Sequence, residues 1–396
     1  MSRILSDHVF SSESVSEGHP DKLCDQISDE VLDCCLRLDA RSRVACNTMV
    51  AYDLLVTVGE ITCSGWSQID TEAIARRTVD EVGYDREELG FWSKSFDYIS
   101  RIHEQSADIA QGIDDGDSDP LDQGAGDQGM MFGYASDETP ELMPAPIAFS
   151  HRILRRLAEL RKTGSIAYLR PDGKAQVSVM YHKGKPAHID TVVISHQTDD
   201  VEIGRIRPDL EETARDLLKP TGLLRNETVF HINPTGRFVL GGPTADSGLT
   251  GRKIIVDTYG GGAGHGGGAF SGKDPSKVDR SAAYYARYVA KNIVAAGLAE
   301  KCEIQIAYAI GIARPVSINI QTFGTGKVDE AKLQSIVGSS EHFDFRPASI
   351  INHFSLLRPQ GWSYRETAAY GHFGRDQFPW EKTDLTDVLK QASGIK

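Results

Sequence analysis

The sequence lacks the features that mark membrane, secreted and zinc-binding proteins. No apolar run approaches the ~18 residues of a membrane span, and the N-terminus, MSRILSDHVF, has no apolar signal-peptide core. The six cysteines form no C-x-x-C pair and no zinc-ligand spacing. We therefore expect a cytoplasmic protein in a reducing compartment, without membrane contact.

Positive charge is also in short supply. The chain has 43 lysines and arginines against 56 aspartates and glutamates, a formal net charge of −13. This balance argues against general nucleic-acid binding, which depends on a basic surface. An acidic protein that binds polyphosphate must gather its cations in one place.

The motifs of two common hydrolase classes are missing as well. The chain has no G-x-S-x-G and no H-E-x-x-H. We infer that any chemistry here depends on stabilising a leaving group more than on abstracting a proton.

What the sequence does have is a glycine-rich stretch, Asp257–Asp279. Seven of the nine residues in 260–268 are glycine, and a β-type run, Lys253–Tyr259, precedes them. Glycine lets backbone N–H groups approach anionic oxygens closely. Lys273 and Lys277 follow and add positive charge. The stretch therefore predicts a polyphosphate site with a divalent cation held by carboxylate.

Two familiar motifs nearly match this stretch. Gly262-x-Gly264-x-x-Gly267 fits the dinucleotide fingerprint, but no helix pattern opens directly after it. Gly267-x-x-x-x-Gly272-Lys273 fits a P-loop until Asp274, which stands where Ser or Thr should hold Mg²⁺. A flexible linker is the competing interpretation of so much glycine, although linkers are usually Gly/Ser repeats.

The length of 396 residues exceeds the roughly 250–300 at which one core splits, so two or three domains are expected. Helical patterns begin near residues 21, 150 and 278, at spacings of 129 and 128, and each precedes two strands and a further helix. We predict an α+β fold of three structurally similar domains in a pseudo-threefold arrangement, each a β-sheet with helices packed on one face. The predicted domains are 1–122, 123–240 and 241–396. Coincidence is the alternative, because this order of elements is common.

The hydrophobic periodicity and the turn residues predict the individual elements. The expected helices are 20–39, Ile69–Val82, one capped by Ser150 and ended by Gly164, Asp209–Leu218, Val278–Ala296 and Asp329–Val337. The expected strands are Val44–Val50, Leu54–Thr62, Gln176–Tyr181, Ile189–Ser195, Ile304–Ile310 and Val316–Phe323.

The segment Gln105–Gly133 is acidic, rich in glycine and weakly apolar. A compact domain rarely keeps so long a loop unless it is a lid or is disordered. Residues 105–129 are therefore either a mobile gate or ordinary disorder.

The tripeptide His19-Pro20-Asp21 opens the first helix. A carboxylate in a first helical turn is favoured by the helix dipole alone. The same tripeptide occurs in J-domain co-chaperones, although there it follows a basic helix. The third interpretation is that His19 hydrogen-bonds a phosphate while Asp21 binds Mg²⁺.

Four cations lie within 26 positions around the glycine tract: Arg252, Lys253, Lys273 and Lys277. Lysines at strand edges are often only solubilising. Their crowding around one anion-shaped loop favours a phosphate-binding role. Lys174, in Arg170-Pro-Asp-Gly-Lys-Ala, is a turn lysine when taken alone.

Several long stretches together resemble one enzyme family. They are residues 12–22 (SESVSEGHPDK), 124–129 (GAGDQG), 238–243 (FVLGGP), 251–260 (GRKIIVDTYG), the glycine tract through Ser281, and 369–374 (AYGHFG). The chain resembles the S-adenosylmethionine synthetases (methionine adenosyltransferases) of bacterial type over nearly its whole length. The resemblance implies that ATP and L-methionine react to give S-adenosylmethionine. Tripolyphosphate would leave and then be hydrolysed to phosphate and diphosphate.

The resemblance also implies roles for individual residues. The expected catalytic residues are His19, Lys174, Arg252, Lys273 and Lys277. The expected ATP-binding residues are His19, Asp172, Lys174, Arg237, Phe238, Asp246, Arg252, Lys253, Ala269 and Lys273. The expected methionine contacts are Glu60, Gln105, Asp246, Lys277 and Ile310. Asp21 and Asp279 are the expected ligands of two Mg²⁺ ions, and Asp127 is expected near the metals or the triphosphate.

One residue departs from the family pattern. The family usually has a glutamate that binds an activating K⁺ where this chain has Asn47. An amide offers an oxygen without charge, so K⁺ should bind weakly. The family further implies a homotetramer, a dimer of dimers with active sites at the dimer interface. The alternatives are another Mg²⁺-dependent, ATP-using enzyme, such as a P-loop-like ATPase, and an interaction protein of the co-chaperone type.

Overall fold

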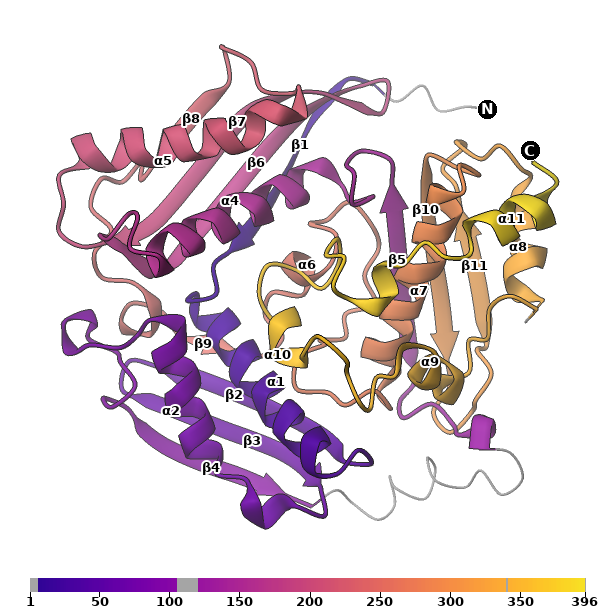
Figure 1. Ribbon diagram of the computed structural model, residues 1–396, viewed down its shortest axis with the longest axis horizontal. Coiled ribbons are helices and arrows are strands. Elements are labelled where there is room, and N and C mark those ends of the chain that lie inside the picture. The colour runs from indigo at the N-terminus through magenta and orange to yellow at the C-terminus, as the bar shows by residue number, and fades with distance from the viewer. Residues whose placement is uncertain (1–5, 105–119, 340, 396) are drawn as a thin grey trace.

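The computed structural model describes residues 6–104, 120–339 and 341–395 (Figure 1). The helices are α1 (Pro20–Leu38), α2 (Thr71–Val82), α4 (Ala145–Lys162), α5 (Ile203–Leu218), α6 (Ile254–Asp257), α7 (Val278–Ala295), α8 (Glu330–Gly338), α9 (Pro347–Phe354), α10 (Tyr364–Thr367) and α11 (Thr386–Ser393). The strands are β1 (His8–Val15), β2 (Arg43–Ala51), β3 (Leu54–Thr62), β4 (Asp97–His103), β5 (Gly129–Ser136), β6 (Leu169–His182), β7 (Lys185–Thr198), β8 (Val229–Ile232), β9 (Gly248–Leu249), β10 (Lys301–Tyr308) and β11 (Ser317–Gln321). None of the helices in these ranges is long and apolar enough to cross a membrane.

The strands form three sheets that repeat one plan. Their strand orders are β9-β2-β3-β4, β1-β6-β7-β8 and β5-β10-β11. In each sheet an antiparallel pair of consecutive strands follows one helix (α1, α4 or α7) and precedes another (α2, α5 or α8). In the first two sheets, the strand after the second helix returns parallel, β4 beside β3 and β8 beside β7. The predicted α+β fold of three similar domains is confirmed.

Each sheet takes its first strand from a different third of the chain. β1 pairs with β6, β5 pairs with β10, and the two-residue β9 pairs with β2, always antiparallel. The sheet built from residues 43–103 is therefore completed by residues 248–249. Because of these exchanged strands, no single cut in the chain separates the three sheets.

Helices cover one face of each sheet, as the alternation along β2 illustrates. Its buried residues, including Val44, Cys46 and Val50, point toward α1, whereas Asn47 and Met49 point the other way and are exposed. Figure 1 shows α1 and α2 over the first sheet and α4 and α5 along the second. The period of two along a strand places alternate residues on opposite faces.

The helix α7 is the most deeply buried element of the third domain. Its arginines Arg280 and Arg287 are nearly inaccessible and form ion pairs with Asp29 of α1 and with Glu381. The C-terminal segment crosses beside α7 (Figure 1), and its Trp380 stacks on Tyr284 with ring centroids 3.8 Å apart. The start of α7 is thereby fixed to α1.

Two predicted elements differ from the structure. The run Lys253–Tyr259 is not a strand: residues 254–257 form the short helix α6, whose Asp257 pairs with the buried Lys22. Its β-branched residues favour a strand, and this tertiary contact overrides that preference. Ser150 is not a helix cap, because α4 begins at Ala145 after Pro144 and Ser150 Oγ donates to the carbonyl of Pro146.

Helix starts and ends elsewhere agree with the prediction to different degrees. The helices α1, α2 and α7 begin and end within two residues of their predicted bounds, and Gly83 ends α2 with φ 111°. The helix α5 begins at Ile203, six residues before the predicted start, with Pro208 inside it. Most of the predicted gate, 105–129, lies outside the described residues, as does Gln105.

Candidate active site

The first group of predicted site residues surrounds the start of α1. His19 caps this helix, and its Nδ1 accepts a hydrogen bond from the backbone N–H of Asp21 at 3.2 Å. Burial, reinforced by the charge of Lys253, lowers the pKa of His19 to about 3. The imidazole is therefore neutral near pH 7, with its proton on Nε2, where it can serve as a hydrogen-bond donor.

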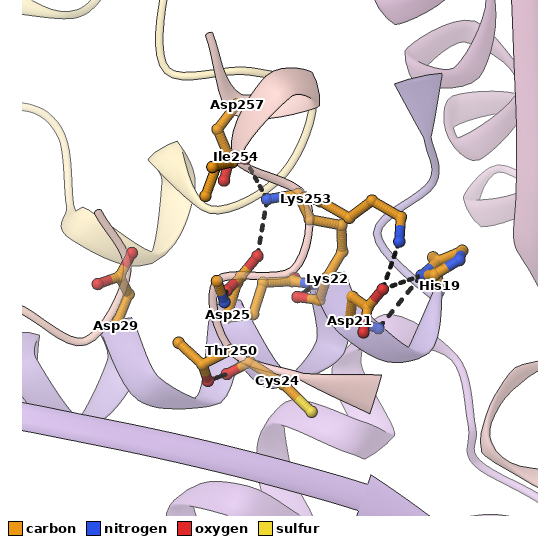
Figure 2. A network of polar contacts seen from close by, with 12 residues as sticks. His19, Asp21, Lys22, Cys24, Asp25, Asp29, Thr250, Lys253, Ile254 and Asp257 are labelled. Atoms are coloured by element: carbon orange, nitrogen blue, oxygen red, sulfur yellow. Dashed lines mark hydrogen bonds and ion pairs between the residues drawn. The ribbon is translucent and has the colours of Figure 1, made fainter. Parts of the chain in front are cut away.

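Asp21 is the electrostatic centre of this group (Figure 2). It accepts hydrogen bonds from the backbone N–H of Leu249 at 3.0 Å and from Lys253 Nζ at 2.5 Å, and Arg252 Nη1 lies 3.5 Å away. Burial alone would raise the pKa of Asp21, but the hydrogen bonds from Lys253 and Leu249 lower it. Asp21 is thus an ionised carboxylate beside two cations.

The strand β6 brings a second carboxylate and a lysine to the same place. Lys174 lies opposite Val15 in the β1–β6 ladder, just before the chain enters α1, and Lys174 and Asp246 both act on the charge of His19. Asp172 Oδ2 accepts the N–H of Gly242 at 2.9 Å, whereas its buried Oδ1 accepts no hydrogen bond from the described part of the chain. Burial raises the pKa of Asp172 to about 6.

We call this group the first half-site; its members are His19, Asp21, Asp172, Lys174, Asp246, Arg252 and Lys253. Arg237 and Phe238 lie at its rim, where the carbonyl of Phe238 accepts the N–H of Thr198. The side chain of Arg237 is exposed and pairs with Asp200.

A second group lies at the start of α7. Lys273 Nζ donates to Asp279 Oδ2 at 2.6 Å, and Lys277 pairs with the fully buried Asp274. The glycine tract approaches this group closely, since a Cβ on Gly268 would lie 2.2 Å from Asp279 Oδ1. Only glycine at this position leaves the carboxylate its space.

The glycine tract packs on strand β5. A Cβ on Gly266 would lie 1.6 Å from the carbonyl oxygen of Met130, and one on Gly264 would lie 2.6 Å from the ring of Phe132. The N–H of Gly264 donates to Glu303 Oε2 at 2.7 Å. No helix follows the tract directly, because α7 begins only at Val278. The dinucleotide fingerprint and the P-loop are therefore correctly rejected.

Three of the predicted methionine contacts, Glu60, Lys277 and Ile310, lie in or near the second group, whereas Asp246 belongs to the first half-site. Glu60 of β3 is opposite Ala45 of β2, and Ala45 in turn bridges to Lys273. Ile310 bridges to Ala125, in the segment that precedes Asp127. The N–H of Gly126 donates to the carbonyl of Ser276, beside Lys277. We call this group the second half-site; its members are Glu60, Asp127, Lys273, Lys277, Asp279 and Ile310. Ala269 lies between the two groups, because a Cβ on Gly251 would lie 2.6 Å from the Cβ of Ala269.

The two half-sites are separate within one chain. Along β2, Ala45 bridges to Lys273 whereas Met49 pairs with Leu249, whose N–H donates to Asp21. Four residues of a strand span roughly 13 Å. Among the described residues, no hydrogen bond or ion pair joins a member of one half-site to a member of the other. One chain thus presents the predicted site residues as two separate groups.

Each half-site contains one of the predicted metal ligands, Asp21 or Asp279. The described part of the chain has no group of three or more His, Cys, Asp or Glu side chains that could hold a metal ion. Mg²⁺ is usually held by one or two carboxylates together with substrate phosphates and water. The carboxylates fit that mode of binding, and they do not fit a cage made by the protein alone.

Sequence reasoning missed the partners of several site residues. Asp274 was noted only as a mismatch to a P-loop, although it binds Lys277 and accepts the N–H of Val44 at 2.7 Å. Asp274 and Lys277 are three positions apart, directly before a helix, and this spacing is a local signal that could have suggested the ion pair. Lys22 and Asp257 pair across 235 positions, and no local pattern predicts such a contact.

Comparison with known proteins gives one consistent result. The chain matches three family models: S-adenosylmethionine synthetase N-terminal domain at residues 7–107, central domain at 122–238 and C-terminal domain at 240–382. It is 55% identical over 398 residues to an S-adenosylmethionine synthase of Desulforudis audaxviator, covering 98% of this chain and 99% of that protein. It is 57% identical over 389 residues to an S-adenosylmethionine synthase of Treponema denticola, covering 97% of this chain and 98% of the relative.

Proposed function

This chain belongs to the S-adenosylmethionine synthetase family, an enzyme family of transferases, and on that premise we propose how it makes S-adenosylmethionine from ATP and L-methionine. The sulfur of methionine attacks the ribose C5′. The S–C5′ bond forms with the sulfur lone pair, the C5′–O bond breaks, and the electron pair leaves with tripolyphosphate. A thioether carries no proton, so the step needs no general base. Tripolyphosphate is then hydrolysed to phosphate and diphosphate.

The first half-site supports this proposal because its donors suit a departing polyanion. Arg252 and Lys253 lie beside a neutral His19 whose Nε2–H is a donor, and Lys174 lies close to the same imidazole. One preorganised donor aimed at developing charge is typically worth about 3 kcal/mol. Several such groups supply the stabilisation that the leaving tripolyphosphate requires. The gathering of these cations around His19 and Asp21 is the observation that carries the proposal.

We assign Asp21 and Asp279 as the residues that would hold Mg²⁺. Bound Mg²⁺ would neutralise phosphate oxygens as a Lewis acid. In this structure each carboxylate is paired with a lysine, Asp21 with Lys253 and Asp279 with Lys273. A carboxylate that turns to a metal frees its lysine for the polyphosphate.

The separation of the half-sites supports an active site shared between two copies of the chain. The outward face of the first sheet has an apolar row that crosses all four strands, and its members are Leu249, Met49, Val56 and Ile99. Leu249, Met49 and Ile99 are 39–41% exposed, on the face opposite α1 and α2. A continuous apolar patch of this kind marks an interaction surface. We propose a homotetramer of two dimers, in which the first half-site of one subunit meets the second half-site of its partner.

A product assay tests the proposed function. With Mg²⁺, ATP should be consumed in proportion to methionine, and mass spectrometry should find a methionine-derived sulfonium together with phosphate and diphosphate. An ATPase would consume ATP without methionine, and a co-chaperone would not form the sulfonium. Lys273→Ala should lower turnover by about 100-fold or more through loss of a transition-state donor. Lys327→Ala, which changes an exposed lysine, is the control.

A further inference from the structure

Lys22 is a fully buried lysine for which the proposed reaction has no use. It follows Asp21 in α1, and its Nζ donates to Asp25 Oδ2 at 2.9 Å and to Asp257 Oδ1 of α6. Figure 2 shows the amine between the two carboxylates. Although burial opposes a charge here, Asp25 and Asp257 raise the pKa of Lys22, so the amine stays protonated.

The carboxylates that bind Lys22 also hold the segment 249–257. Asp25 Oδ1 accepts the N–H of Gly251 at 2.9 Å, and Asp21 Oδ1 accepts the N–H of Leu249 at 3.0 Å. Asp257 is the last residue of this segment. Contacts from the first two turns of α1 therefore fix the segment at its first residue, at its third residue and at its last residue. The two cations of the first half-site that it carries, Arg252 and Lys253, lie between the last two contacts.

The network continues from Asp257 to the start of the other half-site. The carbonyl of Asp257 accepts the N–H of His372 at 2.9 Å, and His372 Nδ1 is hydrogen-bonded to Tyr284 Oη of α7 at 2.7 Å. Arg280 Nε donates to the same hydroxyl at 3.0 Å, and its guanidinium binds Asp29 of α1 in a bidentate pair. The chain of contacts thus returns to α1. It forms a closed ring of buried groups that joins the helices on which both half-sites begin.

Stability alone is a weak explanation for this arrangement. Desolvating charged groups costs several kcal/mol each, and replacing a buried ion pair by apolar residues is often neutral or stabilising. Such a pair does fix one geometry, because the free energy rises whenever the two buried partners separate.

We propose that Lys22 is a positioning residue for the polyphosphate: it ties segment 249–257 to α1 and thereby aims Arg252 and Lys253. This inference rests on the proposed function of the first half-site. Lys22 itself does not touch the substrate, so it is not a catalytic residue. A misplacement of about 1 Å at a reacting centre can cost about 100-fold in rate, so a loosened segment should show clearly in turnover.

The test compares two buried lysines changed in the same way. Lys291 is 4% exposed, lies on α7 and donates to Glu381 Oε2 at 2.7 Å, away from either half-site. Binding of inorganic tripolyphosphate with Mg²⁺ is measured by calorimetry at a temperature where each variant is folded. We expect Lys22→Met to weaken binding by about tenfold or more and to lower kcat at least as much, with the KM for methionine unchanged. Lys291→Met should lose thermal stability yet keep tripolyphosphate affinity within about twofold of the unmodified chain.

Equal affinities of Lys22→Met and the unmodified chain would overturn the inference, as would equal losses in both Lys→Met variants. If Lys22→Met does not fold, Asp257→Asn replaces it. The amide keeps an acceptor for Lys22 but removes the charge, and we expect a loss of about threefold to tenfold in tripolyphosphate affinity.

The calorimetry needs no turnover, so it separates the positioning role of Lys22 from the proposed function. An unmodified chain that binds tripolyphosphate but forms no sulfonium refutes the proposed function alone, and one that does not bind tripolyphosphate overturns the positioning role.

Discussion

Burial decides the charge of several histidines, and the consequence differs with their surroundings. In His19 the Nδ1 atom accepts a hydrogen bond, so the neutral imidazole keeps its proton on Nε2, which can donate to the proposed leaving group. His196 is not a member of the first half-site. It lies 2% exposed in β7, with Nδ1 2.9 Å from the carbonyl of Gln197, and burial lowers its pKa to about 4. Its neutrality therefore affects the stability of the fold rather than the reaction.

The lowered pKa of His196 predicts a specific dependence of stability on pH. A histidine with a pKa of about 6.5 when unfolded takes up a proton on unfolding below that pH, so its contribution to stability is present at pH 7 and falls as the pH falls toward 4. Between pH 7 and pH 5 the loss from this residue is about 2 kcal/mol. We measure the unfolding free energy with urea at pH 7 and at pH 5. Between these two values it should decrease by about 2 kcal/mol less in His196→Gln than in the unmodified chain. His8→Gln, at an exposed site, should leave the decrease unchanged, and an unchanged decrease in His196→Gln would contradict the assignment.

Asn47 leads to a prediction about monovalent cations. It is exposed on the outward face of β2, two residues from Met49 of the apolar row. An amide oxygen carries no charge, so a weakly held K⁺ should matter little. We expect rates in KCl and NaCl to agree within about twofold, whereas Asn47→Glu should make the rate rise with KCl but not with NaCl. Strong activation of the unmodified enzyme by KCl over NaCl would refute this.

Candidate site residues could be named from the sequence, but their pairings could not. Short motifs such as His19-Pro20-Asp21 carry the resemblance to the family within a few positions. The ion pair between Asp21 and Lys253 joins residues 232 positions apart, and its existence depends on how α1 meets segment 249–257. The division into two half-sites has the same origin, because it follows from strand pairing and not from any local pattern.

At the scale of elements, periodicity predicted most of the helices and strand pairs, and tertiary contacts explain the failures. In Lys253–Tyr259 the residues have a strong strand preference, yet Lys22 draws Asp257 into a helical turn. Helix α4 begins at Ala145, directly after Pro144 and five residues before the serine that was predicted to cap it. The local preference of the residues for helix or strand predicts the structure correctly where the apolar face is long, as in α1 and α7. It fails where a buried charge needs a partner from elsewhere in the chain.

The contact of α7 with β5 offers a test at this scale. A Cβ on Gly133 of β5 would lie 2.0 Å from the backbone carbon of Ala286, so Gly133→Ala must push the helix away from the sheet. Overpacking of this kind typically costs about 1–3 kcal/mol, and we expect the upper end because the obstacle is backbone. The urea midpoint should fall, and turnover should fall with it because α7 carries the second half-site. Gly204→Ala, in α5 with nothing within 4 Å, is the control and should be neutral or stabilising by up to about 1 kcal/mol. A midpoint in Gly133→Ala equal to that of the control would contradict this close packing.

At the scale of the whole molecule, the three sheets are one interlocked unit. Each is completed by a strand from another third of the chain, so a fragment cut between the predicted domains would leave a sheet without its first strand. The repeat of one topology was predictable from the order of elements. The exchange of strands was not, because the two-residue β9 is too short to show a periodic pattern.

Mixed dimers of two variants test whether the active site is shared between two subunits. If the first half-site of one subunit works only with the second half-site of its partner, His19→Ala and Lys273→Ala damage different halves of every site. In a dimer that contains one chain of each kind, one site receives both damaged halves and the other receives two intact halves. Co-expression of the two variants in equal amounts gives such mixed dimers half of the time, so we expect the unfractionated mixture to have about a quarter of the unmodified activity and the purified mixed dimers to have about half. Each variant alone should remain nearly inactive, because one half of every site is then damaged. The two chains carry different affinity tags. Dimers that carry both tags are purified and assayed for sulfonium formation. Dually tagged dimers no more active than either variant alone would mean that each chain completes its own site, and the apolar row on the first sheet would then need another explanation.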